Sequence, residues 1–331
     1  MRNPDDFVKV AFDSRPAKCT HGVGRYARCL LDALTGLGQC EILETHQPRR
    51  CDLFHSPWLD GALLRSPVPT VVTLHDLSPL KHHGQYLRSM LRFKLRYLAV
   101  QRATRVIVPT CAVAEEAEAV LDIPRERIAV IPEAPAASLH ARPDAEVRDV
   151  RGRFSLPERY LVWVGAMQTP EPRKRIAALA RTARSIPLVL VGPAAPWAHE
   201  LPDVILTGAV SDDDLAAIYT GAHALVFPSD DEGFGLPPIE ALACGTPVVA
   251  SDVPALREVL DGRATLRAVD DLDGLIAAAE SAERPAPPAP AWTWDDAAHA
   301  TWQVYCEASE ETGLSQIARP KHRAATLVKD A

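Results

Sequence analysis

The sequence predicts an α/β protein with two doubly wound, Rossmann-like domains that face a central cleft. Short apolar segments alternate with longer amphipathic segments along both halves of the chain, a pattern typical of βαβ units and parallel sheets. The length of 331 residues exceeds what one ordinary hydrophobic core organises, so two domains are expected. Between residues 132 and 157, proline, alanine, arginine and aspartate replace the apolar periodicity, which predicts the domain boundary there.

The first domain, residues 1–150, is expected to begin with a strand and a helix. The apolar run 8–13 predicts the strand, and 25–37 predicts a helix because its apolar residues recur every three or four positions. Further strands are expected at 52–55, 70–75, 105–108 and 128–131, and further helices at 86–102 and 112–121.

The second domain, residues 151–290, repeats this alternation. Its strands are expected at 160–164, 188–191, 203–206, 224–227 and 247–250, and its helices at 175–184, 212–219, 238–243 and 272–282. The proline-rich stretch 285–290 predicts a stiff spacer, followed by a last long helix at 294–309. The tail, residues 313–331, is expected to be flexible.

Composition narrows the function classes. The formal net charge of −7 gives no reason to expect nucleic-acid binding. No apolar run reaches the roughly 18 residues that cross a bilayer. The first residues carry acids where a signal peptide would be basic and then apolar, which indicates a cytoplasmic protein. Seven scattered cysteines without a CxxC pair favour reduced thiols over zinc sites or disulfides.

The segment from Glu232 to Glu240 is the strongest candidate site. A buried strand ends just before it, and glycines at 233 and 235 precede prolines that start a helix. Free amides at that helix start suit a phosphate or diphosphate. Glu240 can accept hydrogen bonds from the vicinal hydroxyls of a ribose, and Glu232 can bind hydroxyls of a second sugar. The alternative is a tight turn with a helix-capping glutamate, and the paired acids favour a ligand site.

Three further segments follow predicted strands. Gly165 ends a strand, and the later pair Arg173 and Lys174 can neutralise a diphosphate, unless they only form a solvated helix start. Gly22 and Gly24 lie between the first strand and helix, where glycines permit close approach of a ligand or simply form a loop. His75 ends another strand and is therefore expected at the cleft, although a lone histidine is also common in structural roles.

Together these segments resemble retaining glycosyltransferases of the GT-B fold, specifically glycosyltransferase family 4, which includes many bacterial mannosyltransferases. The resemblance covers almost the whole chain. It rests first on EGFGLPPIEALACGTPVVASDVPALREV, which is similar to the acid–x7–acid signature of that family. HGVGRYARCLLDAL, DLFHSPW, VVTLHDLSPL and VILTGAVSDDDLAAIYTGAHALVFPS are similar to other segments of it.

The resemblance implies a role for each matched residue. Glu232 would bind donor-sugar hydroxyls, Glu240 would bind the ribose, and His75 would lie beside the transferred sugar. Arg173 and Lys174 would hold the leaving diphosphate in place of a metal. The last helix, 294–312, would close back on the first domain. The remaining implied donor contacts are Gly165, the amides of Gly233, Phe234, Gly235 and Leu236, and the base-bordering residues Gly208, Ala209 and Val210; Gly22 and Gly24 would form a loop near the diphosphate and acceptor.

The implied reaction is metal-independent, retaining transfer of a sugar from a nucleotide sugar to a hydroxyl of a glycan, a lipid-linked glycan or a metabolite, as in polysaccharide biosynthesis. No cofactor or metal is expected, and no nucleic acid. Two alternatives remain open: a GT-B nucleotide-sugar epimerase or hydrolase, and a non-catalytic nucleotide-sugar-binding subunit. A dinucleotide oxidoreductase is disfavoured because no GxGxxG follows the first strand.

The chain also departs from the family pattern. The family often has an arginine directly after the strand-end glycine, and this chain has Ala166 there. Where many members have Pro-Asn-Gly, this chain has Pro132, Glu133 and Ala134. Residues 81–105 contain seven cations and no acid. That segment could contact an anionic membrane or lipid-linked acceptor, but a helix with a solvated basic face is the favoured interpretation.

Overall fold

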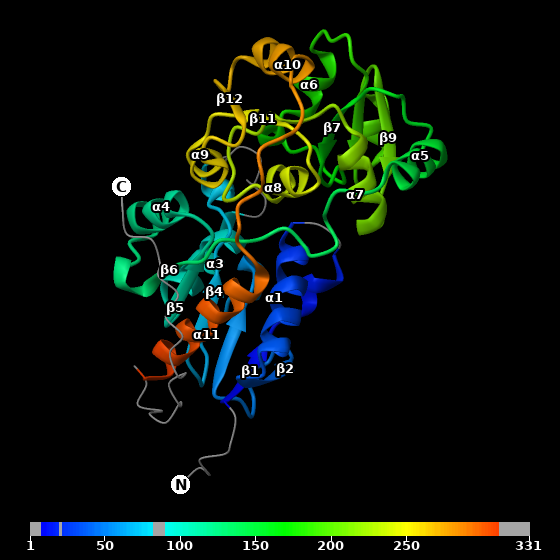
Figure 1. Cartoon of the computed structure of the whole chain (residues 1–331). Coiled ribbons are helices and arrows are strands. Elements are labelled where there is room, and N and C mark those ends of the chain that lie inside the picture. Colours follow the sequence, from blue (N-terminus) through cyan, green and yellow to red (C-terminus); the bar gives the residue numbers. More distant parts are fainter. Residues whose placement is uncertain (1–7, 20–21, 82–89, 311–331) are drawn as a thin grey trace.

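The computed structural model describes residues 8–19, 22–81 and 90–310 of the chain. It consists of two α/β domains, one above the other in Figure 1, and each is built on a six-stranded parallel sheet. The predicted fold class is confirmed. All strands in both sheets run parallel, so each connection crosses over a face of the sheet, and helices cover both faces.

The strands of the first sheet are arranged in the order β2-β1-β3-β4-β5-β6. Their bounds are β1 Val8–Phe12, β2 Cys40–Glu44, β3 Leu53–Ser56, β4 Thr70–Thr73, β5 Arg105–Val108 and β6 Ile128–Val130. The helices of this domain are α1 Val23–Leu37, α2 Ser78–Lys81, α3 Met90–Gln101 and α4 Cys111–Leu121. The predicted helix at 86–102 is described only from residue 90 onward.

The second sheet has the order β12-β11-β10-β7-β8-β9. Its strands are β7 Leu161–Val164, β8 Leu188–Val191, β9 Val204–Gly208, β10 Ala224–Phe227, β11 Val248–Ser251 and β12 Thr265–Arg267. Its helices are α5 Asp144–Arg153, α6 Ile176–Arg181, α7 Asp212–Gly221, α8 Leu236–Ala243, α9 Pro254–Leu260 and α10 Leu272–Glu280, and the chain continues into α11 Trp294–Glu310.

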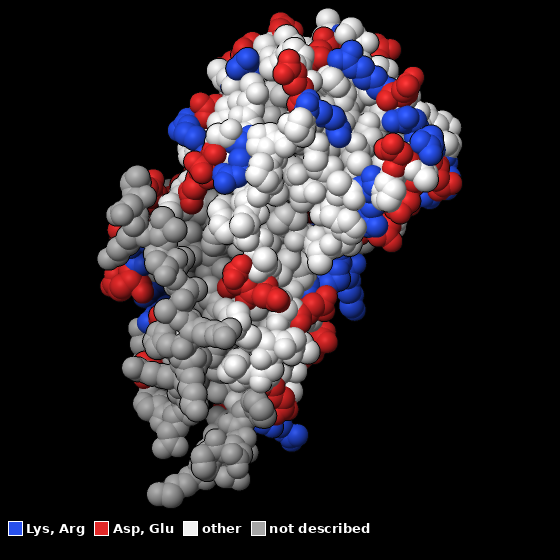
Figure 2. All heavy atoms as spheres, viewed as in Figure 1, with Lys and Arg blue, Asp and Glu red and all other residues white. Residues whose placement is uncertain are grey.

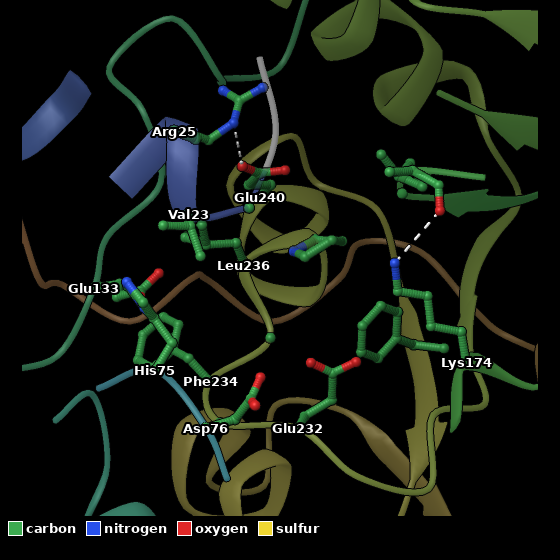
Figure 3. Close-up of a pocket in the computed structure, with 18 of the residues that line it drawn as sticks. Val23, Arg25, His75, Asp76, Glu133, Lys174, Glu232, Phe234, Leu236 and Glu240 are labelled. Atoms are coloured by element: carbon green, nitrogen blue, oxygen red, sulfur yellow. Dashed lines mark hydrogen bonds and ion pairs between the residues drawn. The ribbon is translucent and has the colours of Figure 1, made fainter. Parts of the chain in front are cut away.

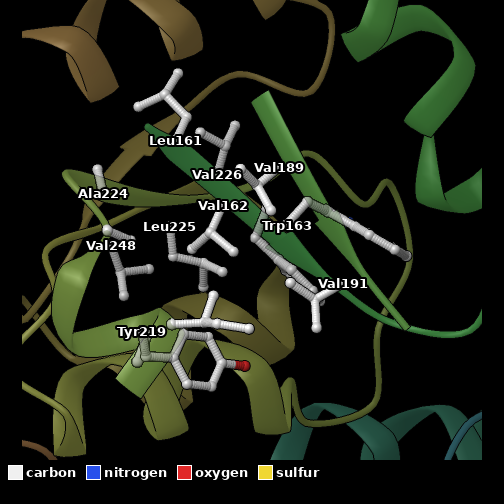
Figure 4. Packing of buried hydrophobic residues seen from close by; sticks show 14 of the residues in the cluster. Leu161, Val162, Trp163, Val189, Val191, Tyr219, Ala224, Leu225, Val226 and Val248 are labelled. Carbon is white, nitrogen blue, oxygen red and sulfur yellow. The ribbon is translucent and has the colours of Figure 1, made fainter. Parts of the chain in front are cut away.

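Side chains that alternate across the strands build the hydrophobic cores. In the first domain, Val71 faces a cluster with α1 and α11, whereas its neighbour Val72 faces a second cluster with α3 and α4. In the second domain one large cluster surrounds β7 and β10, where Figure 4 shows Val162 and Leu225 beside Tyr219 of α7. The buried strands explain why their apolar runs were recognisable in the sequence.

Several elements were not predicted from the sequence. The strands β2 and β12 lie at the edges of their sheets and are only partly buried, so their residues lack a continuous apolar run. Helix α5 is rich in charged residues and buries only Val147 and Val150 in its interior. Helix α9 begins at Pro254, within a stretch for which the apolar pattern predicts no element.

The change from one core to the other occurs earlier than residue 150. Ala134 packs in the core of the first domain, whereas Ala136 and Leu139 already pack in the core of the second. Helix α5 contacts α7 of the second domain. These contacts place the division between Ala134 and Ala136. The sequence did not reveal that α5 belongs to the second domain, because this polar helix lacks apolar periodicity.

After the second domain, the chain returns to the first. Trp292 contacts both cores, and α11 then packs along α1 beneath the domain interface in Figure 1. Tyr305 of α11 is fully buried and its hydroxyl lies 2.6 Å from His55 Nδ1. Helix α11 is thus an integral part of the first domain. Within the described ranges, no helix is both long and apolar enough to cross a membrane.

We predict that Trp302→Ala destabilises the first domain by about 3–5 kcal/mol, because it removes a large buried side chain from the contact between α11 and the sheet. His299→Ala, on the exposed side of the same helix, is the matched control. Denaturant unfolding followed by far-UV circular dichroism measures both. A loss no larger than that of the control would show that α11 adds little to this core.

Candidate functional site

A pocket lies between the two domains at the carboxyl ends of the parallel strands. The loops after β1, β4 and β6 line it from the first domain, and the loops after β7 and β10 line it from the second. Strand order reverses between β7 and β10, and ligands of open α/β sheets bind at such switch points. Figure 3 shows the side chains that converge there.

The segment from Glu232 to Glu240 forms the floor of this pocket. Gly235 has φ 93° and caps α8, so the left-handed backbone that the helix start requires falls on a glycine. Glu232 is 15% exposed, and its Oε2 lies 3.7 Å from Arg173 Nη1. Burial raises the pKa of Glu232 above its usual value, and the charge of Arg173 opposes this rise.

Glu240 is almost completely buried in the first turns of α8. Tyr219 donates a hydrogen bond to Oε2 at 3.2 Å, and Arg25 Nε lies 3.2 Å from Oε1. Burial raises the pKa of Glu240, and Arg25 acts against that rise. Within the described part of the chain, the contact of Oε1 with Arg25 is an ion pair without hydrogen-bond geometry, so Oε1 retains lone pairs for a ligand hydroxyl.

Arg25 is a site residue that the sequence analysis did not select. It belongs to the first turn of α1 and is 5% exposed. Its guanidinium spans the domain interface, with Nη2 2.7 Å and Nη1 3.1 Å from the two carboxylate oxygens of Asp212, in addition to the contact with Glu240. A cation at a helix N-terminus is unfavourable without such partners. The position of Arg25 at the start of a predicted helix was therefore the feature of the sequence that could have indicated its role.

Arg173 and Lys174 lie on the opposite wall, in a short 3-10 turn, Pro172–Lys174, that precedes α6. Glu171 holds both cations: its Oε2 lies 3.3 Å from Arg173 Nε, and its Oε1 lies 3.0 Å from Lys174 Nζ. Lys174 Nζ also lies 3.4 Å from the carbonyl oxygen of Ala166, as marked in Figure 3. The structure thus brings together the predicted cation pair and adds Glu171 as its counter-ion, which was missed because a single acid beside two cations carries no distinctive pattern.

His75 lines the pocket where the sequence placed it. Its Nδ1 lies 3.0 Å from Glu133 Oε1, and its Nε2 lies 3.0 Å from the carbonyl oxygen of Pro57. Burial alone would lower the pKa of His75, but the hydrogen bond and charge of Glu133 outweigh it and raise the pKa above 6.5. Glu133 and the pocket residue Asp76 are further residues that the sequence analysis did not select as site residues.

The loop after β10 also docks the second domain on the first. The carbonyl oxygen of Gly233 accepts a hydrogen bond from Thr110 at 3.0 Å, and Asp231 binds Ser78 and Lys81, each at 2.6 Å. A methyl group added at Gly233 would lie 1.7 Å from the carbonyl oxygen of His75. Glycine at this position therefore permits two backbones from different domains to meet.

Not all predicted site residues reach the pocket. Gly208, Ala209 and Val210 lie at and after the end of the edge strand β9 and are not among the lining residues. Gly22 lines the pocket with φ 55°, whereas Gly24 packs against the carbonyl oxygens of Pro16 and Cys19. Close packing of α1 on the preceding turn accounts for Gly24 without a ligand. Gly165, Phe234, Gly235 and Leu236 do line the pocket.

The surface charges agree with the low basicity of the chain. On the face shown in Figure 2, acidic and basic side chains of the described residues are interspersed over the second domain. In the basic segment 81–105, Lys81 pairs with Asp231, Arg96 with Asp60 and Arg105 with Glu307, whereas Arg88 lies outside the described residues. In residues 8–19, 22–81 and 90–310, no three His, Cys, Asp or Glu side chains group as metal ligands would.

Comparison with known families gives two matches. Residues 158–283 match the family described as glycosyl transferases group 1, and residues 41–134 match the one described as Glycosyltransferase Family 4. Together the matches include strands of both domains and most of the pocket. The carboxyl-terminal match contains Gly165, Arg173, Lys174, Glu232 and Glu240.

Individual relatives span different parts of the chain. The D-inositol 3-phosphate glycosyltransferase of Thermobispora bispora is 30% identical, and the match covers 85% of this chain and 76% of that protein. The serotype-specific mannosyltransferase WbdA of Escherichia coli is 31% identical over 219 residues. That match covers 59% of this chain and 26% of WbdA, so the chain spans about a quarter of the length of this relative.

Solved structures share the fold. The sucrose-phosphate synthase of Thermosynechococcus elongatus has a TM-score of 0.65 at 20% identity, with 93% of this chain and 98% of that chain covered. HepE of Anabaena, solved in complex with UDP-glucose, has a TM-score of 0.65 at 17% identity, with 94% and 100% covered. These neighbours identify the arrangement of the two domains as the GT-B fold.

We predict that Gly233→Ala weakens the docking of the two domains, because the added methyl group cannot fit against the carbonyl oxygen of His75. The loss of unfolding free energy should be about 1–3 kcal/mol. Gly152→Ala is the control, since an added methyl group meets no atom within 4 Å there. Chemical denaturation and small-angle scattering test this: equal stability and radius of gyration in both variants would refute the close contact.

Proposed function

The chain belongs to the group 1 glycosyltransferases of family 4, and from that premise we propose that it transfers a sugar from a nucleotide-sugar donor to a hydroxyl group of an acceptor. One observation carries the proposal: the partly buried Glu232 and the buried Glu240 flank a glycine-rich helix start, and the cations Arg173 and Lys174 line the same pocket. The match to the D-inositol 3-phosphate glycosyltransferase of Thermobispora bispora, which covers 85% of this chain and 76% of that protein, supports it.

The proposed donor lies across the floor of the pocket. The backbone amides of Phe234, Gly235 and Leu236 precede or begin α8 and point their partial positive charge toward a diphosphate. Glu240 accepts hydrogen bonds from the ribose hydroxyls, to which its Oε1 offers lone pairs. Glu232 binds hydroxyls of the transferred sugar, because it stands on the other side of the amides.

In the proposed reaction, the bond between the anomeric carbon and the diphosphate oxygen breaks, and a bond to the acceptor oxygen forms. The leaving group is an anion as soon as it forms, so catalysis requires positive charge rather than a strong acid. Arg173 and Lys174 supply that charge without a metal. We propose retention of configuration, with attack on the face that the diphosphate leaves and transfer of the acceptor proton to the departing phosphate.

The acceptor enters from the first domain, beside Gly22 and His75. The WbdA relative is named a mannosyltransferase and the Thermobispora bispora relative an inositol phosphate glycosyltransferase, so we propose a hexose donor. The proposed acceptor is a hydroxyl of a glycan, free or lipid-linked, or of a small polyol. Contact of residues 81–105 with a membrane and a cytoplasmic location stay predictions.

We predict that Glu232→Gln lowers kcat/KM for transfer by about a hundredfold, in the range of a lost charge-stabilising contact. Glu240→Gln should mainly raise KM for the donor, because it replaces a carboxylate oxygen that would accept hydrogen bonds from the ribose hydroxyls. A thermal-shift screen of UDP-, GDP- and TDP-sugars selects the donor. The rate of product formation is then measured with and without EDTA. Unchanged turnover in Glu232→Gln would contradict its assignment, and loss of turnover in EDTA would contradict metal independence.

The acceptor requirement distinguishes transfer from the alternatives. If the nucleotide sugar is consumed equally without acceptor, the protein is a hydrolase or epimerase. If it binds and is never consumed with any tested acceptor, the protein is a binding subunit. Consumption that requires an acceptor supports transfer.

We predict that Glu171→Gln tightens binding of a nucleoside diphosphate by about threefold to tenfold, as expected for removal of a partly exposed ion-pair partner. Arg173 and Lys174 would then bind the diphosphate without first breaking their ion pairs with Glu171. Isothermal titration with UDP and GDP measures the change, and Glu158→Gln, at an exposed position of the same domain, is the control. Weaker binding would show that Glu171 orients the cations instead of competing for them.

A further inference from the structure

Two histidines at the ends of neighbouring strands have opposite kinds of partners. His55 contacts two hydroxyl groups, Tyr305 at Nδ1 and Thr73 at Nε2, and a hydroxyl can donate or accept. A neutral ring satisfies both contacts, and burial lowers the pKa of His55 to about 3. His75 instead contacts the carbonyl oxygen of Pro57 and a carboxylate oxygen of Glu133.

The partners of His75 determine its protonation. A carbonyl oxygen only accepts, so Nε2 must donate to Pro57. If the ring were neutral, the lone pair of Nδ1 would face the Glu133 oxygen at 3.0 Å, and two acceptors would repel each other. With a proton on both nitrogens, the ring donates two hydrogen bonds, and the one to Glu133 is charge-assisted.

The pair also has a direction. The side chain of His75 is 16% exposed, and that of Glu133 is 5% exposed. Both residues line the pocket, and they lie side by side on the opposite side of the view from Lys174 in Figure 3. The ring is thus the more accessible member of the pair, and the carboxylate is the more deeply buried one.

We propose that Glu133 is a positioning residue that holds His75 as an imidazolium at neutral pH, so that the first domain adds positive charge to the wall facing the donor diphosphate. The part that concerns the diphosphate rests on the proposed function. The protonation itself rests only on the hydrogen-bond partners of the ring.

The other cations of the pocket show why such a charge matters. Arg173 and Lys174 share Glu171, and Arg25 is held by Asp212 and Glu240. All these carboxylates belong to the second domain. The carboxylate that contacts His75 instead comes from the first domain, after β6, so this pair can stay in place when the second-domain carboxylates bind ligand groups.

The proposal implies a dependence on pH with a defined sign. Since the pKa of His75 is raised above 6.5, the ring stays charged at and just above that pH, and the charge is lost as the pH rises through the raised value. Loss of the proton removes both the positive wall and the hydrogen bond to Glu133. The titratable or charged groups that face this ring or its surroundings are Tyr26 and Arg25 of α1, His55 of β3, Asp76 beside it, Glu133 after β6, and Glu232 on the opposite loop.

The first test measures the protonation directly. In protein labelled with ¹⁵N only in histidine, the signals of His75 are assigned by their loss in His75→Gln. In the wild type at pH 7, we expect both ring nitrogens of His75 to be protonated and the ring of His55 to be neutral. In Glu133→Gln the introduced amide can donate to Nδ1 and the charge of Glu133 is lost, so we expect the pKa of His75 to fall and its ring to be neutral at pH 7. Glu307→Gln, which removes a carboxylate remote from the pocket, should leave His75 charged.

The second test measures the consequence for a diphosphate. Titration with UDP and GDP should show binding about fivefold weaker in Glu133→Gln, and uridine and guanosine should bind equally to both proteins. The difference in affinity between the wild type and Glu133→Gln should shrink as the pH rises past the titration of His75 in the wild type. Equal loss for the nucleosides would indicate a structural role and overturn the proposal.

A neutral His75 in the wild type at pH 7 would also overturn the proposal, and this measurement does not need Glu133→Gln to fold. If UDP and GDP bind to neither protein while His75 is charged, the proposed donor class is wrong and the role of Glu133 in protonation stands. An unchanged affinity for UDP and GDP with a neutral ring in Glu133→Gln would refute the electrostatic role.

Discussion

Burial of charge between two hydrophobic cores is the constraint on which this site depends. A charged group removed from water must find an opposite charge or hydrogen bonds, and the pocket satisfies this with three connected sets. Arg25 joins Glu240 and Asp212, Arg173 and Lys174 join Glu171 and Glu232, and His75 joins Glu133. Because the first set crosses the domain interface, the same interactions that neutralise the buried charges also fix the two domains relative to each other.

The parallel sheets explain why these groups meet. Every strand ends at the same edge of its sheet, and the two edges face each other across the cleft, so short loops deliver side chains from distant parts of the chain. The loop after β10 has two functions at once. Asp231 and Gly233 dock it on the first domain, and Glu232 presents its carboxylate to the pocket. A displacement of the domains would therefore also disassemble the proposed donor site.

The sequence predicted most of the buried elements and several of the residues that line the pocket, and it failed where a tertiary contact decides. Buried strands gave continuous apolar runs, so the fold class was recognisable, whereas the partly exposed edges β2 and β12 were not. The acids at 232 and 240 stood out by their fixed spacing around glycines. Arg25 and Glu133 did not, because their meaning lies in partners on other elements: Asp212 is 187 residues from Arg25, and His75 is 58 residues from Glu133.

The three charge sets differ in how readily they can exchange partners. Glu240 and Arg25 are nearly inaccessible, with side chains 3% and 6% exposed, and a ribose would meet groups that are already fixed. Glu171 is 26% exposed and lies beside a short 3-10 turn, so its contacts with Arg173 and Lys174 can break at low cost. The groups proposed to bind the ribose are consequently fixed by burial, whereas those proposed to bind the diphosphate can exchange partners. In the proposed reaction this difference would favour release of the product, since cations fixed permanently on a diphosphate would slow its departure.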